Sequence, residues 1–130
     1  MYHRLRVRFP KGMETAITVV FPLLAGVALY KYLPTHYTPG RLVRNYLPDG
    51  LWAYSLLSCI LIIWNRKPHW VWILGAVISA LLFEYGQYSG VLPGTGDWLD
   101  VATYLIFFGF ALWTNAYFEN RNIHKPQIKP

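Results

Sequence analysis

Three acids and a glutamine lie where two apolar segments join, within the stretch from Trp70 to Tyr117, and they are the residues best suited to chemistry. Glu84 and Gln87 are three residues apart, which places them on one face of a helix. Asp97 and Asp100 follow a short loop rich in glycine. Their oxygens could hold a hard cation such as Mg²⁺ or Ca²⁺, with Glu84, Asp97 and Asp100 as the metal ligands. Glu84 and Asp100 could instead form a catalytic acid–base pair.

Simpler interpretations of the same residues stay open. Asp97 is a favourable residue at the position before a helix, and Asp100 would lie in the first turn of that helix, where an acid complements the helix dipole. Glu84 could be a paired carboxylate near a helix end that holds no other molecule. A phosphate-binding loop is not indicated, because the loop sequence GVLPGTG lacks the Lys-Ser/Thr ending of such motifs.

The elements that position these residues are predicted to be membrane helices. The chain has 130 residues, of which 55% are hydrophobic and only 14% charged, whereas soluble domains carry about 25% charged residues. Four apolar segments of suitable length predict an all-α integral membrane protein, a single domain with four transmembrane helices in an antiparallel bundle. The expected spans are residues 15–32, 49–65, 70–88 and 98–117, and residues 118–130 are expected to form a mobile tail.

Several local features refine this prediction. Pro22 is expected to kink the first span, and Gly26 to allow a close contact between helices. Residues 33–50 are expected to be the longest connection, with a short interfacial helix over residues 41–47. Small residues spaced four apart, such as Ala76 and Ala80, favour close packing of helices.

The distribution of basic residues predicts the orientation. Nine Lys and Arg residues lie before the first span, between the second and third spans and after the fourth span, whereas three lie at the end of the first span or in the connection that follows it. The positive-inside rule then places both termini in the cytoplasm, in the inner (plasma) membrane of a cell. Because the basic residues are interleaved with apolar segments instead of forming one patch, a nucleic-acid partner is excluded.

This topology brings the polar residues to the outer side together with residues of the first outer connection. Arg41 and Arg44 could pair there with the acids or with lipid phosphates. The predicted binding partners are therefore the lipid bilayer, an anionic lipid or envelope precursor, and a second membrane protein, and no cofactor other than a divalent cation is indicated. The candidate ligand-binding residues are Asp49, Glu84, Gln87, Asp97, Asp100, Arg41 and Arg44.

The pattern Glu84-x-x-Gln87, a glycine-containing loop and then Asp97-x-x-Asp100 before an apolar helix resembles the C-terminal signature of VanZ-like membrane proteins. The chain resembles a divergent member, since Tyr104 stands where that family has an asparagine and Ala53 where it has a histidine. The resemblance implies a small bacterial protein of the cell envelope, linked to resistance against glycopeptide antibiotics.

Three functions are consistent with these observations. The first is a non-enzymatic envelope protein whose outer polar cluster binds a cation, a lipid headgroup or an envelope precursor. The second is a membrane enzyme that acts on a lipid-linked substrate. The third is a structural subunit of a larger membrane complex, in which the acids only cap helices.

Overall fold

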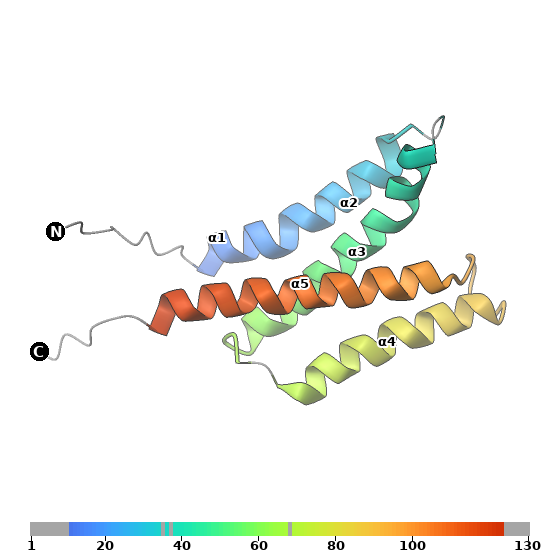
Figure 1. The fold of residues 1–130 in the computed structure, drawn as a ribbon. Helices are drawn as coiled ribbons and strands as arrows, with labels where there is room; N and C mark the ends of the chain where they lie inside the picture. The colour runs from blue at the N-terminus through green and yellow to red at the C-terminus, as the bar shows by residue number, and fades with distance from the viewer. Residues whose placement is uncertain (1–10, 35, 37, 68, 124–130) are drawn as a thin grey trace, which may run out of the picture.

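The computed structural model describes residues 11–34, 36, 38–67 and 69–123, and it is helical throughout its regular elements. Within these residues, four helical segments are long and apolar enough to cross a membrane, which confirms the predicted class of multi-pass, all-α membrane protein (Figure 1). The elements are α1 (Lys11–Thr15), η1 (Ala16–Val20), α2 (Phe21–Tyr32), α3 (Thr38–Ile63), α4 (Trp70–Tyr88) and α5 (Trp98–Ile123).

The first span runs through α1, η1 and α2 and contains the irregularity that Pro22 predicts. The five residues of η1 form a π-helix that ends two residues before Pro22, and the N–H of Phe21 donates to the carbonyl of Ala16, five residues earlier. Pro22 has no N–H for the carbonyl of Thr18, four residues before it, and its ring would crowd that carbonyl in a regular helix. The wider π turn gives the carbonyls before the proline more room, which relieves this conflict.

The second span differs from the prediction. Residues 38–63 form the single helix α3, so the expected long connection with a separate interfacial helix is wrong for most of its length. Pro39 lies in the first turn, where a missing N–H costs nothing. Pro48 lies inside the helix and leaves the carbonyl of Arg44 without its helical donor. The helix is nonetheless continuous through Pro48, and α3 packs against both α2 and α5.

The core lies around α3, which packs most extensively against α5 and α2. Its buried apolar residues Ala53, Leu57 and Leu61 face residues from α4 and α5, namely Ile73, Ala76, Ala80, Tyr104, Phe108 and Ala111. The predicted close contact at Gly26 is confirmed, because a Cβ atom there would lie 3.3 Å from the carbonyl oxygen of Pro48. The buried Ala76 and Ala80 likewise confirm that this small-residue face packs inside the bundle.

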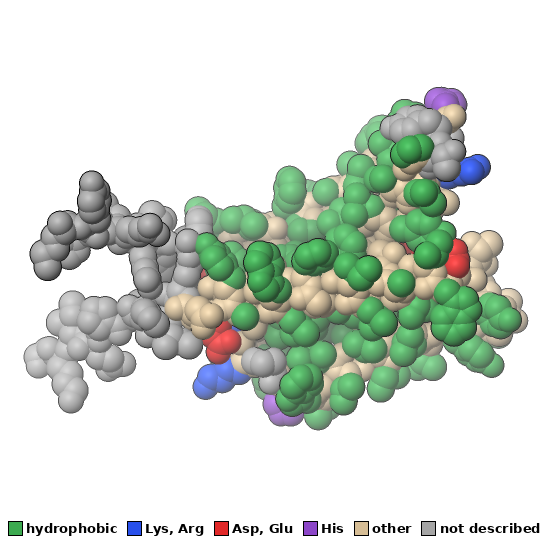
Figure 2. Space-filling model, in the orientation of Figure 1, with side chains coloured by type: hydrophobic (Ala, Val, Ile, Leu, Met, Phe, Trp, Pro, Cys, Tyr) green, Lys and Arg blue, Asp and Glu red, His purple; other side chains and the backbone are tan. Residues whose placement is uncertain are grey.

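Large apolar side chains cover the outside of the bundle. In Figure 2 they occupy most of the visible face, while the acidic and basic side chains lie near its two ends. Helix α4 contributes many of them, and its Leu82 and Trp70 are 63% and 72% exposed. This distribution is what lipid contact requires, because water would not tolerate so much continuous apolar surface.

The two ends of the bundle contain different parts of the chain. The start of α1 and the end of α5 lie at the same end, and the α2–α3 and α4–α5 connections lie at the other (Figure 1). Helix α5 continues beyond the predicted limit of 117 as far as Ile123. The part of the expected mobile tail between residues 118 and 123 is therefore helical, and its remainder, residues 124–130, lies outside the described residues.

Candidate functional site

Glu84 is the central residue of the candidate site. It lies one turn before the end of α4 and is only 5% exposed. The hydroxyl of Tyr104 on α5 donates to its Oε1 atom at 3.1 Å. Its Oε2 atom is buried and has no hydrogen-bond partner among the residues that the structure describes. A buried carboxylate oxygen without a donor is costly, so this atom marks a place where a further group is needed.

Two further acids surround Glu84. Asp100, in the first turn of α5, is 9% exposed, and Asp49 on α3 is partly buried. Both are close enough to Glu84 to interact with it electrostatically. The expected convergence of Asp49, Glu84 and Asp100 at one end of the bundle is thus present, and it concentrates negative charge around the unpaired oxygen of Glu84.

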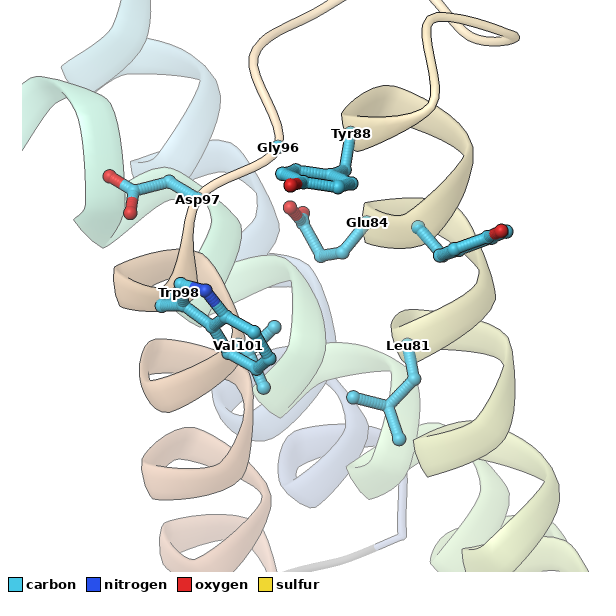
Figure 3. A pocket seen from close by; sticks show the side chains of 8 residues that line it. Leu81, Glu84, Tyr88, Gly96, Asp97, Trp98 and Val101 are labelled. Carbon is cyan, nitrogen blue, oxygen red and sulfur yellow. The ribbon is translucent and has the colours of Figure 1, made fainter.

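Asp97 is directed away from this cluster. Its side chain points away from Glu84 in Figure 3, accepts a hydrogen bond from the Tyr46 hydroxyl at 2.8 Å, and accepts another from the backbone N–H of Leu99 at 3.2 Å. These two donors hold the pKa of the Asp97 carboxyl below its usual range. The capping interpretation of Asp97 is confirmed, and the bond to Tyr46 also ties the start of α5 to α3.

Gln87 stabilises the loop after α4 and does not pair with Glu84. Its side-chain Nε2 donates to the carbonyl of Pro93 at 3.2 Å. The loop approaches α4 closely, since a Cβ atom on Gly96 would lie 2.6 Å from the backbone nitrogen of Tyr88. The expected joint presentation of a carboxylate and an amide by Glu84 and Gln87 is therefore not observed.

The two arginines predicted to join the acids lie elsewhere. Arg44 donates from Nε to the backbone carbonyl of Tyr30 at 2.9 Å, and its guanidinium lies 5.5 Å from the centre of the Tyr30 ring. It therefore connects α3 to α2. Arg41 is exposed. Within the described part of the chain, neither arginine forms an ion pair with the acids, so they do not neutralise the negative charge around Glu84.

A cavity of about 420 Å³ opens between α4 and α5 beside Glu84 (Figure 3). Its wall combines aliphatic side chains and aromatic rings with only two acids, and the lining residues are Leu81, Glu84, Tyr85, Tyr88, Gly96, Asp97, Trp98 and Val101. None of these described lining residues is basic. A mostly apolar hollow with one buried acid suits the polar end of a molecule that is otherwise apolar.

The carboxylates do not form a metal site in this arrangement. Over residues 11–34, 36, 38–67 and 69–123, no group of three His, Cys, Asp or Glu side chains could hold a metal ion. Because Asp97 turns toward Tyr46, the combination of Glu84, Asp97 and Asp100 considered from the sequence is not assembled as a set of ligands.

A second polar cluster, at the opposite end of the bundle, was missed by the sequence analysis. Arg66 is only 8% exposed and donates from Nε and Nη2 to the Glu14 carboxylate at 3.0 and 2.6 Å. It also donates to Asn115 Oδ1 at 3.3 Å, and the Asn115 amide donates to the Arg66 carbonyl at 3.1 Å. Arg66 therefore points into the bundle and not toward the membrane surface. It joins α1, the α3–α4 turn and α5.

Comparisons with protein-family models, with curated proteins and with solved structures find no match for this chain.

Proposed function

We propose that this chain is a membrane-embedded binding protein that holds the polar end of an amphiphilic molecule between α4 and α5. The observation that carries this proposal is the buried Oε2 atom of Glu84, which lacks a partner within the described structure and borders a cavity of about 420 Å³. A donor group of the bound molecule would satisfy that oxygen, and the aliphatic and aromatic wall would contact the rest of the molecule.

Binding is favoured over catalysis by the position of the second acid. In the acid–base alternative, Glu84 and Asp100 must both reach the substrate. Asp100 is not among the described residues that line the cavity, whereas Glu84 is. A purely structural role is less favourable, because a structural carboxylate would have both oxygens hydrogen-bonded inside the bundle.

Native mass spectrometry of the protein extracted from membranes tests this function. The Val101→Trp variant places a large ring in the cavity, and we expect its apparent affinity for co-purified lipid-like molecules to fall about tenfold or more, equivalent to about 1.4 kcal/mol. Leu105→Trp introduces the same ring one turn later on α5, at a side chain that is 51% exposed, and should bind as the wild type does. Equal binding by all three proteins would refute the proposed cavity.

We also propose that the cavity faces the outer side of the inner membrane. The excess of Lys and Arg at the opposite end of the bundle supports this orientation, by the positive-inside rule. In a variant without Cys59, a cysteine at Thr95 should react with an impermeant reagent added to intact cells, and a cysteine at Gln127 should not. Labelling at Gln127 alone would reverse the orientation.

A role in the bacterial cell envelope, with a link to glycopeptide-type antibiotic resistance, is proposed from the resemblance to VanZ-like proteins alone. The pattern that supports it is Glu84-x-x-Gln87 followed by Asp97-x-x-Asp100. Removing the protein from its host should then change the sensitivity to a lipid-bearing glycopeptide, and unchanged sensitivity would end this part of the proposal.

A further inference from the structure

We infer that the polar group bound beside Glu84 is a primary ammonium carried by a lipid. This inference rests on the proposed function and adds the chemical class of the ligand. The starting point is again Glu84 Oε2, which belongs to a side chain that is 5% exposed, lines the cavity and lacks a partner in the part of the chain that the structure describes. An acceptor in this position requires an N–H or O–H donor from the ligand.

The surrounding charge selects a cationic donor. Asp49 and Asp100 interact electrostatically with Glu84 from two other helices, and no lysine or arginine occurs among the described lining residues. Arg44 is occupied by the carbonyl and ring of Tyr30. A phosphate or carboxylate brought to Glu84 would be repelled, whereas an ammonium would form a charge-assisted hydrogen bond in a region of low dielectric constant.

The wall of the cavity favours an organic cation over a metal ion. A metal ion would need several oxygen ligands, and the described residues supply no group of three acidic, histidine or cysteine side chains for one. The cavity instead has three aromatic side chains in its wall, from Tyr85, Tyr88 and Trp98. Aromatic faces attract ammonium groups, most strongly where water is excluded.

The position of Glu84 along the membrane indicates that the ammonium belongs to a lipid. Glu84 is four residues before the end of α4, which corresponds to about 6 Å along the helix axis. Leu81 and Val101 continue the cavity wall toward the middle of the bundle with apolar surface. A headgroup amine can reach this depth from the lipid phase while its acyl chains remain beside the exposed apolar side chains of α4 and α5.

A headgroup series tests the inference. Wild-type protein is placed in phosphatidylcholine nanodiscs that contain, in separate samples, phosphatidylethanolamine or phosphatidylglycerol with identical acyl chains, and bound lipid is measured by native mass spectrometry. Choline has the positive charge but no N–H donor, and glycerol has donors but an overall anionic headgroup. We expect about a tenfold preference for phosphatidylethanolamine over both other lipids, since the lost bond would be charge-assisted.

Two variants complete the test. Glu84→Gln should abolish the preference for the amine headgroup, whereas Glu119→Gln, which removes an acid near the opposite end of α5, should retain it. A Glu84-dependent preference for phosphatidylglycerol or phosphatidylcholine would overturn the ammonium inference and leave the proposed binding function intact. If neither Glu84→Gln nor Val101→Trp changed the binding of any of the three lipids, both the ammonium inference and the proposed binding function would be overturned.

Discussion

Arg66→Ala is expected to lower the free energy of unfolding by about 3–5 kcal/mol, the cost typical of removing one partner from a buried ion pair. The side chains of Arg66 and Glu14 are only 10% and 9% exposed, and their closest atoms, Nη2 and Oε2, are 2.6 Å apart. The Arg66 guanidinium also donates to Asn115 and lies 4.7 Å from the centre of the Phe118 ring. The substitution would leave the Glu14 carboxylate buried without its cation.

The measurement is reversible unfolding of the purified protein in mixed micelles with increasing denaturing detergent. Lys67→Ala removes a neighbouring exposed positive charge and should change stability by no more than about 0.5 kcal/mol. A double variant, Glu14→Leu with Arg66→Met, should recover much of the loss, because it removes both charges and leaves apolar groups of similar size. A loss below about 1 kcal/mol for Arg66→Ala would show that the ion pair does not hold this end of the bundle.

Leu57→Ala is the second substitution with a large expected effect. Leu57 is fully buried in the second half of α3, the helix with the most extensive contacts in the bundle. In a membrane, a leucine gains little by leaving lipid for protein, so the loss comes mainly from the cavity and the missing van der Waals contacts. We therefore expect a decrease in stability of about 2 kcal/mol, at the lower end of the range for buried leucines.

The matched control is Leu82→Ala on α4. Leu82 is 63% exposed toward the surface that lipid would cover, so its removal leaves no internal cavity. The same detergent titration should show a change within about 0.5 kcal/mol. Equal losses for Leu57→Ala and Leu82→Ala would contradict the central position of α3.

The class of fold and the number of candidate spans could be predicted from the sequence because they depend on the length and hydropathy of continuous segments. The extent of α3 could not, since Pro39 and Pro48 look alike as interruptions of a helix. Only the structure shows that Pro39 lies in the first turn and that α3 continues as one helix through Pro48.

The candidate site was predictable to the extent that it depends on topology. Alternating spans bring Asp49, Glu84 and Asp100 to one end of the molecule, as expected. The rotation of each helix and the local bonds of the loop decide the remaining details, and these bonds turn Asp97 toward Tyr46 and Gln87 toward Pro93.

Two partners were missed for different reasons. In the sequence, Tyr104 stands out only as a departure from the VanZ-like pattern. It follows Asp100 by four residues, however, and therefore lies on the same face of the helix as Asp100. Glu14 and Arg66 are 52 residues apart, so their spacing in the sequence does not indicate that they pair. A signal was present, because the predicted topology places Glu14 at the same end of the bundle as the turn that contains Arg66.

The most direct test of the central claim is a crystal structure of the protein grown from a lipid phase that contains phosphatidylethanolamine. We predict an elongated molecule between α4 and α5 whose polar end lies about 3 Å from Glu84 Oε2, the distance of a hydrogen bond. A cavity that contains only water, or a protein side chain donating to that oxygen, would contradict the claim that Glu84 is the anchor of a binding site.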